Sequence, residues 1–253
     1  MEHVPPAVCQ LAERLDALGW VTDLLVAGSL ATGDYVPGVS DLDLVALTGE
    51  PVGQARQEIL AGLHRELDQG PARGLDLGCV YVDAGRLADP GALHPTWTHG
   101  SLVQRSLSGV TRAELVRHGF AVLGRPPAAA LPPMTDEDVR RAARAELCGY
   151  WAMAAGRPLW WLNPVIADLG LTSMARGRHA LRTGQLLTKT KAIEQAHAPA
   201  WLKDQLRARR QGRPVASPRV RTALIAWRDA RRTVAGACRS GPAGGYNSSS
   251  GAE

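Results

Sequence analysis

Two aspartates in a short apolar segment are the residues of this chain best suited to phosphate chemistry. Asp41 and Asp43 lie in the sequence SDLDLV at residues 40–45, which favours a β-strand. Residues two apart on a strand share a face, so both carboxylates could hold divalent metal ions on a triphosphate. The same alternation is also compatible with the solvated face of a half-buried strand, so the pair alone leaves both interpretations open.

The segment before these aspartates favours the phosphate interpretation. Residues 24–27 form a short apolar run that ends in Gly28 and Ser29. Glycine lets the backbone approach a ligand closely, and backbone N–H groups at the start of a helix bind anions. A strand, a Gly-Ser turn, a loop and a second strand with paired acids form a much rarer combination than the acids alone. Together these features predict a site of nucleotidyl transfer.

Length and composition limit the classes of protein to which this chain can belong. The chain has 253 residues, of which 45% are hydrophobic, enough for one large domain or two small ones. The four cysteines are far apart and form no Cys-x-x-Cys pair, so we expect buried free thiols rather than a disulfide framework or a zinc site. No targeting pattern opens the chain, and no window approaches the roughly 20 apolar residues of a membrane span. We therefore expect a cytoplasmic protein that does not bind membranes.

The net charge of +5 comes largely from arginines concentrated in residues 207–232. Such a concentration is compatible with a polyanionic partner. A general bias toward Ala, Gly, Pro and Arg explains it equally well, and we assign most of these arginines to solvated helix surface. We expect no nucleic-acid partner and a monomeric protein.

Hydrophobic periodicity predicts an α+β chain with two parts. An amphipathic helix at residues 7–19 leads into the first strand, and a second helix opens at Pro51 and ends near Gly70. A further strand at 75–82 follows, and this order predicts a small mixed sheet with helices. Residues 84–110 show no clear period and are predicted to be a loop with short elements.

The second part is predicted to be all helical. A proline-rich linker at 126–133 precedes Thr135, which with three acids after it is a strong helix start. Further helices are predicted at about 164–183, 190–197, 199–211 and 218–236, two of them ending at Gly184 and Gly212. We assign the first domain to residues 1–128, a helical-bundle domain to 134–238 and a disordered tail to 239–253.

The first half resembles the polymerase-beta-type nucleotidyltransferase superfamily, and the whole layout is similar to the aminoglycoside 3''-adenylyltransferases that act on streptomycin and spectinomycin. Three further stretches share the resemblance: VLGRPP at 122–127, the helix that ends at Gly184, and Lys189 five residues later. The resemblance covers roughly residues 20–235. It implies a nucleotidyltransferase domain, a helical domain that clamps substrate and nucleotide, and magnesium-dependent transfer of AMP from ATP to an antibiotic hydroxyl, which confers resistance.

The resemblance also implies roles for the triphosphate and metal residues. Gly28, Ser29 and Ser40 would hold or support the triphosphate. Asp41 and Asp43 would ligate Mg²⁺ and take part in catalysis. Asp76 takes the position of the general base, where the family has glutamate. Because aspartate is one methylene shorter, Asp76 would act directly, through a water molecule, or as a third metal ligand.

The remaining roles fall on the helical part and on one loop. Arg176 and Lys189 match positions that reach the nucleotide phosphates from the helical domain. Trp97 and Asp168 are the candidates for contact with the acceptor, because a polycationic aminoglycoside needs stacking surfaces and carboxylates.

Two alternatives remain open at the level of sequence. The same chemistry could act on another small-molecule or protein hydroxyl. A non-catalytic module could instead keep this fold and use the arginine-rich last helices as an electrostatic surface for nucleic acid. The second alternative predicts salt-dependent retention of nucleic acid and no need for Asp41.

Overall fold

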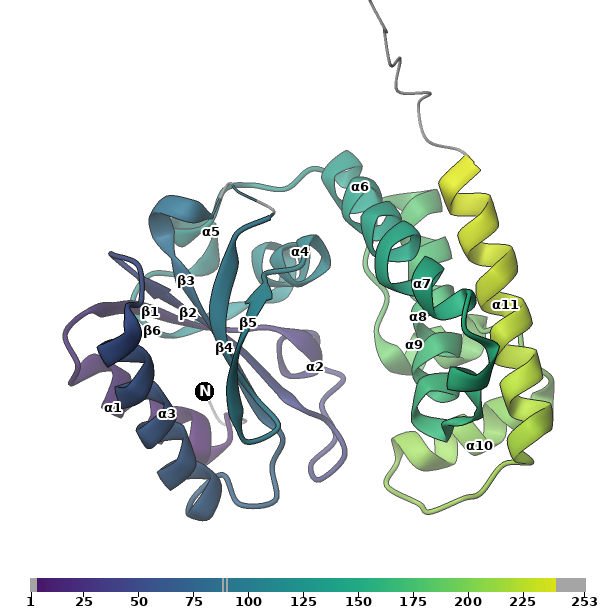
Figure 1. Ribbon diagram of the computed structural model, residues 1–253, viewed down its shortest axis with the longest axis horizontal. Coiled ribbons are helices and arrows are strands. Elements are labelled where there is room, and N and C mark those ends of the chain that lie inside the picture. Colours follow the sequence, from purple (N-terminus) through teal and green to yellow (C-terminus); the bar gives the residue numbers. More distant parts are fainter. Residues whose placement is uncertain (1–3, 88, 90, 240–253) are drawn as a thin grey trace, which may run out of the picture.

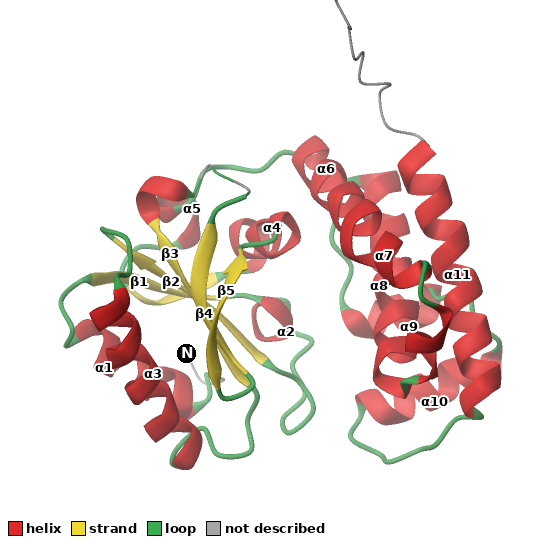
Figure 2. Ribbon diagram, viewed as in Figure 1, coloured by secondary structure: helices red, strands yellow, loops and turns green. Residues whose placement is uncertain are grey.

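A mixed β-sheet organises the N-terminal half of the chain (Figures 1 and 2). The computed structural model describes residues 4–87, 89 and 91–239. Within them the strand order is β5-β4-β3-β2-β1-β6, with β2 and β3 parallel and all other neighbours antiparallel. The strands are β1 (Val21–Val26), β2 (Leu42–Thr48), β3 (Leu77–Asp83), β4 (Leu93–Thr98), β5 (Ser101–Ser106) and β6 (Phe120–Leu123).

Helices cover both faces of this sheet. On one face α1 (Pro6–Asp16) and α3 (Gln54–Gln69) contribute Leu11 and Leu60 to the larger core. On the other face α4 (Gly109–His118) and α5 (Pro127–Ala130) pack over a smaller core that includes Leu115. Because both faces are covered, the central strands can be apolar along nearly their whole length.

Residues 84–110, which the sequence predicts to be a loop with short elements, contain more regular structure than expected. They contain a β-hairpin, β4 and β5, whose turn is His99–Gly100 with φ of 48° and 74°. The side chains of β5 are mostly exposed because it is the edge strand, so no alternation of apolar and polar residues marks it. The alternation of apolar and polar residues, which we use to predict strands, is therefore absent from β5 although β5 is a strand.

The second half is helical, as predicted, which confirms the α+β architecture. Its helices are α6 (Asp136–Glu146), α7 (Ala152–Ala155), α8 (Pro164–Thr183), α9 (Lys189–Gln195), α10 (Ala200–Arg210) and α11 (Arg219–Arg239). Thr135 forms a capping box with Asp138 at the start of α6, and Gly184 ends α8 in the left-handed conformation, with φ of 72°. The predicted tail at 239–253 lies outside the described residues apart from Arg239.

The prediction of four free thiols is wrong. Cys148, between α6 and α7, forms a disulfide with Cys238 near the end of α11, with the two Cα atoms 5.7 Å apart. The bridge forms because α11 packs against the segment between α6 and α7, a contact that the sequence separation of 90 residues does not reveal. Of the other two cysteines, Cys79 is buried as expected and Cys9 is exposed.

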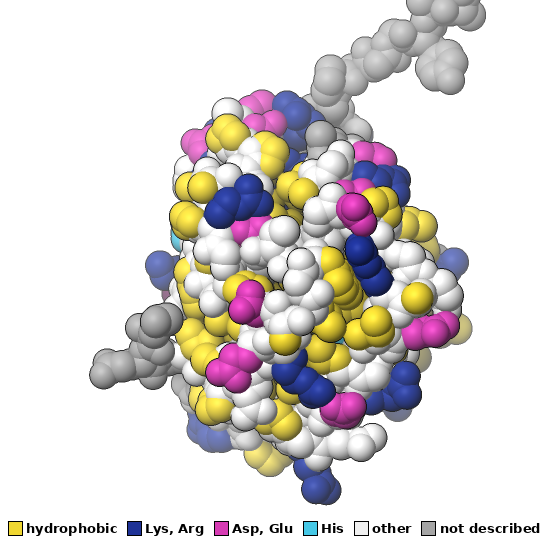
Figure 3. Space-filling model, turned by 90° about the vertical axis from the view of Figure 1, so that its left-hand side faces the viewer, with side chains coloured by type: hydrophobic (Ala, Val, Ile, Leu, Met, Phe, Trp, Pro, Cys, Tyr) yellow, Lys and Arg dark blue, Asp and Glu magenta, His cyan; other side chains and the backbone are white. Residues whose placement is uncertain are grey.

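Positive charge is concentrated on α11. This helix carries six arginines and one aspartate, a net charge of +5 that equals the net charge of the whole chain. On the face of the molecule drawn in Figure 3, basic and acidic side chains are interspersed. Although α8 and α11 are 20 and 21 residues long, no helix in the described part of the chain is apolar enough over a sufficient length to cross a membrane.

The VLGRPP motif is attached to the sheet through an ion pair between Arg125 and the buried carboxylate of Asp23. Asp23 on β1 is fully buried and accepts hydrogen bonds from the backbone N–H of Arg125 at 2.7 Å and from its guanidinium at 2.7 and 3.0 Å. Gly124 makes this approach possible, since a Cβ there would lie 2.2 Å from the carbonyl oxygen of Thr22. Burial alone would raise the pKa of Asp23, but the bonds from Arg125 and Thr22 outweigh burial and lower that pKa.

We predict that Asp23→Asn lowers the free energy of unfolding at pH 7 by about 2 kcal/mol, because it replaces a fully buried carboxylate that accepts charge-assisted hydrogen bonds from Arg125. A lowered pKa stabilises the fold above the unfolded-state pKa near 4, so the difference from wild type should shrink as the pH falls below that value. Urea unfolding at pH 7 and at pH 3 measures both effects. Asp204→Asn, which removes an exposed partner of Arg207, is the control and should leave the midpoint unchanged.

Candidate active site

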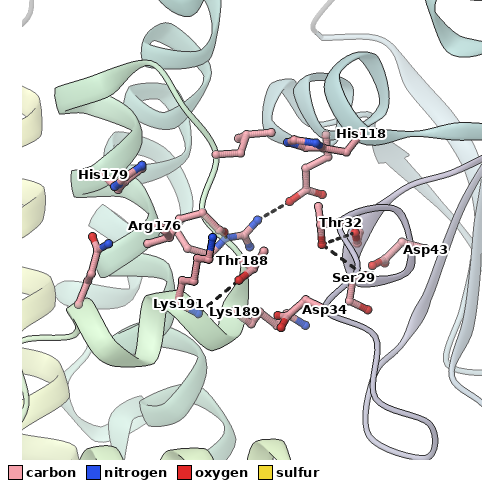
Figure 4. Close-up of a pocket in the computed structure, with 15 residues that line it drawn as sticks. Ser29, Thr32, Asp34, Asp43, His118, Arg176, His179, Thr188, Lys189 and Lys191 are labelled. Atoms are coloured by element: carbon pink, nitrogen blue, oxygen red, sulfur yellow. Dashed lines mark hydrogen bonds and ion pairs between the residues drawn. The ribbon is translucent and has the colours of Figure 1, made fainter.

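A cavity of about 490 Å³ lies between the sheet and the helical region (Figure 4). One wall comes from α2 (Gly28–Ala31), the loop after it and β2, with α4 above them. The opposite wall comes from α8, the segment 186–188 and α9. Predicted phosphate-binding residues from both halves of the chain therefore face one space.

Gly28 and Asp43 are in direct contact on the sheet side. Gly28 has φ of +61°, and a Cβ at this position would lie 2.0 Å from Oδ2 of Asp43. The backbone N–H of Ala27 donates to the carbonyl oxygen of Asp43 at 2.8 Å, which fixes the two strands at this point. Only glycine fits here. Ser29 follows it in the first turn of α2, where backbone N–H groups have no intrahelical partners and can meet an anion.

The three acids of the predicted metal set lie at the ends of two neighbouring strands. Leu42 pairs with Leu77 in the parallel register, and its N–H donates to the carbonyl oxygen of Asp76 at 2.8 Å, so Asp41 and Asp76 are neighbours. The carboxylate of Asp76 lies 3.6 Å from Nδ1 of His99. Among the described residues no three His, Cys, Asp or Glu side chains come close enough to hold one metal ion. A three-carboxylate site is thus not preformed.

Asp41 and Asp43 nevertheless suit a Mg²⁺ ion that also binds phosphate. Such ions take one or two carboxylates and complete their shell with water and phosphate oxygens. Among the described residues no ion pair uses either side chain, so both carboxylates keep their oxygens for a ligand. The donor chemistry fits the metal that the resemblance implies.

The surroundings of Asp43 disfavour its negative charge. Solvent reaches the carboxylate from the cavity, but protein encloses it on the other sides. Burial and the nearby charge of Asp41 raise the pKa of Asp43 to about 6, although Lys189 acts in the opposite direction. A cation placed at Asp41 and Asp43 would relieve this repulsion.

Arg176 and Lys189, the two cations expected from the sequence to reach a nucleotide, both line the cavity. Arg176, on α8, donates to the carbonyl oxygen of Leu187 at 2.9 Å and forms an ion pair with Glu114 of α4. Lys189 is the first residue of α9, whose N-cap is Thr188. Among the ion pairs of the described residues none involves Lys189 or Lys191, so both ammonium groups are available to phosphate.

Five predicted site residues do not line this cavity: Asp41 and Asp76, described above, and Ser40, Trp97 and Asp168. Ser40 is buried and accepts hydrogen bonds from the N–H of Val36 at 2.9 Å and from Arg210 at 2.7 Å, so its hydroxyl holds a loop. The ring of Trp97 is 2% exposed and its Nε1 donates to Asp68. Asp168 is bound by Arg209 at 2.6 and 2.9 Å. Trp97 packs in the sheet core because β4 is a strand and not the loop on which stacking was expected.

Two acids that the sequence did not single out line the cavity. Glu114 lies on α4 with its side chain 11% exposed. Asp34 lies in the loop after α2. A lone acid on the buried face of the helix 109–118 was the available signal for Glu114, whereas nothing in the loop sequence distinguishes Asp34. Figure 4 shows Asp34 and Asp43 on the α2 side of the cavity and Arg176 on the α8 side.

We predict that Asp43→Asn raises the free energy of unfolding at pH 8. A carboxyl whose folded-state pKa is raised favours the fold only while protonated, so that contribution is lost as the pH rises through about 6. The neutral amide avoids this loss, and the advantage of the variant should disappear below pH 4. Thermal unfolding across pH 4–8 measures it, with Asp16→Asn on the exposed surface of α1 as the control. A variant less stable than wild type at pH 8 would contradict the electrostatic account.

The comparisons with known proteins agree with this geometry. Residues 8–81 match the family model described as nucleotidyltransferase domain. A search of curated proteins found no match. Among solved structures, the chain is similar to the spectinomycin adenyltransferase AAD(9) from Enterococcus faecialis with ATP and spectinomycin, with a TM-score of 0.69 and 16% identity over 89% of this chain and 96% of that one. The chain thus contains a nucleotidyltransferase domain and shares the fold of this solved adenyltransferase.

Proposed function

We propose that the protein transfers AMP from ATP to a hydroxyl of an aminoglycoside or aminocyclitol antibiotic of the streptomycin or spectinomycin type, and so confers resistance. One observation carries the proposal: Gly28, Ser29 and Asp43 face Arg176 and Lys189 across a single cavity. A backbone cradle, a carboxylate and two cations are the groups that triphosphate recognition needs. The neighbouring structure, which was solved with ATP and spectinomycin, supports the same reaction and the same acceptor class.

The transfer breaks a phosphoanhydride bond of ATP and forms a phosphoester bond to the acceptor. The acceptor oxygen attacks the α-phosphorus of ATP, the bond between that phosphorus and the bridging oxygen breaks, and pyrophosphate leaves. The hydroxyl proton passes to Asp76, directly or through a water molecule. The exposed position of Asp76 at the start of β3, beside Asp41, supports this role because an acceptor can reach it.

The remaining polar groups of the cavity would bind and orient the nucleotide. Ser29 and the first turn of α2 would hold phosphate oxygens, while Arg176 and Lys189 would hold them from the opposite wall. Mg²⁺ held by Asp41 and Asp43 would supply positive charge that neutralises the triphosphate and the departing pyrophosphate. Lys191 would add a third cation on the same side.

Recognition of the acceptor would use residues other than Trp97 and Asp168. The ring of Trp97 is buried, and Asp168 already pairs with Arg209. Within the main cavity Glu114 is the carboxylate best placed to receive a cationic amine once phosphate attracts Arg176 away from it. The exchange would keep both buried charges paired throughout.

We predict release of pyrophosphate from MgATP that depends on streptomycin or spectinomycin. Purified protein should be assayed against a panel that also contains kanamycin and gentamicin. Asp41→Asn and Asp43→Asn should abolish release without unfolding the protein, because each removes a metal ligand. Undiminished turnover in either variant would remove the metal-site assignment. MgATP binding without release on any antibiotic would point to another small-molecule or protein hydroxyl as acceptor.

We predict that Asp76→Asn lowers kcat by 100-fold or more, on the order of what general-base catalysis contributes, with little change in the dissociation constant for MgATP. Single-turnover rates and calorimetric binding of MgATP separate the two quantities. His99→Ala, which removes only the neighbour of Asp76, is the matched control and should change kcat far less. A change confined to nucleotide affinity would show that Asp76 is a metal ligand and not the base.

A further inference from the structure

Arg210 reaches from the end of α10 into the loop between α2 and β2. Its Nη1 donates to the hydroxyl of Ser40 at 2.7 Å, and its Nη2 donates to the backbone carbonyl of Asp34 and lies 3.3 Å from the Asp34 carboxylate. The side chains of Arg210 and Asp34 are only 10% and 13% exposed. One guanidinium therefore fixes both ends of the segment 34–40, which joins the Gly28-Ser29 turn to Asp41 and to Asp43 of β2.

The same segment is tied to the start of α9. Oδ2 of Asp34 also accepts a hydrogen bond from the backbone N–H of Thr190 at 3.0 Å. Thr190 directly follows Lys189, whose charge acts on Asp43 across the cavity. In Figure 4 Asp34 extends from the loop after α2 toward Lys189. Asp34 and Arg210 thus connect the wall that carries the acids to the wall that carries the cations.

We propose that Arg210 is a positioning residue for nucleotide binding: it holds the segment 34–40 against α9 and α10, so that Lys189 stays opposite Asp43. The proposal rests on the proposed function, since it assumes that MgATP occupies this cavity. Arg210 does not itself line the cavity, so it acts through Asp34 and Ser40.

The geometry requires arginine at this position. Two separate nitrogens serve a hydroxyl, a carbonyl and a carboxylate, whereas a lysine ammonium is a single point of charge on a flexible stem. The contacts lie outside the apolar cores of both halves, which are built from other residues. Loss of Arg210 should therefore loosen the cavity without removing either core.

The test measures binding of MgATP to the full chain by calorimetry. Arg210→Ala should weaken MgATP binding tenfold or more, which corresponds to about 1.4 kcal/mol or more. Millimolar guanidinium chloride should restore part of this affinity by filling the vacated site, whereas the same concentration of urea should not. Arg207→Ala is the matched control, because Arg207 lies on the same helix and its side chain, among the residues that the structure describes, pairs with exposed Asp204 alone. It should bind MgATP as wild type does.

The outcomes separate this proposal from the proposed function. Wild-type protein that does not bind MgATP would refute the proposed function and this inference with it. Wild-type binding together with equal affinity in Arg210→Ala would overturn the inference alone. Weaker binding that guanidinium does not restore would assign Arg210 a general structural role and also overturn it. Should Arg210→Ala fail to fold, Arg210→Lys replaces it, and wild-type affinity in that variant would contradict the proposal.

Discussion

The contact between the backbone of Gly28 and the carboxylate of Asp43 is the constraint on which the rest of the site depends. A side chain at position 28 would collide with Asp43, so the turn after β1 must be bare, and the start of α2 comes to lie beside the acid. The antiparallel pairing of β1 and β2 then fixes the positions of the Asp41 and Asp43 carboxylates relative to this turn. Arg176 and Lys189 of the helical region can bind a phosphate group near Asp43 only if they lie opposite this carboxylate.

Charge in the cavity is arranged in two kinds of pair. Glu114 with Arg176 and Asp34 with Arg210 are closed contacts between the halves, and each satisfies a group that is largely buried. Asp43 and Lys189 face each other without forming an ion pair, which leaves both available for a ligand. An anionic nucleotide would place negative charge beside Lys189, and its metal ion would place positive charge beside Asp43. The two closed ion pairs hold the walls of the cavity in place, whereas Asp43 and Lys189 remain available to bind a ligand.

Sequence predicted those features that local chemistry determines. The Gly-Ser turn, the alternating acids, the capping box at Thr135 and the end of α8 at Gly184 each need particular residues at particular backbone positions. The β4–β5 hairpin, the Cys148–Cys238 bridge and the partners of Glu114 and Arg210 could not be predicted, because each depends on segments brought together by the fold. Trp97 and Asp168 were chosen by residue type and by an approximate match in position to the family, and neither criterion distinguishes a buried ring or a paired acid from one that binds a ligand.

The positive charge of α11 makes the electrostatic field around the molecule asymmetric. This helix lies on the outer side of the helical region, away from the sheet (Figure 1), and it holds a net charge equal to that of the entire chain. Beyond about 8 Å its field is largely screened at physiological salt, but at lower ionic strength it extends further. Anions such as nucleotides would be attracted and polycations repelled, so the two kinds of molecule would encounter this protein at rates that respond to salt in opposite ways.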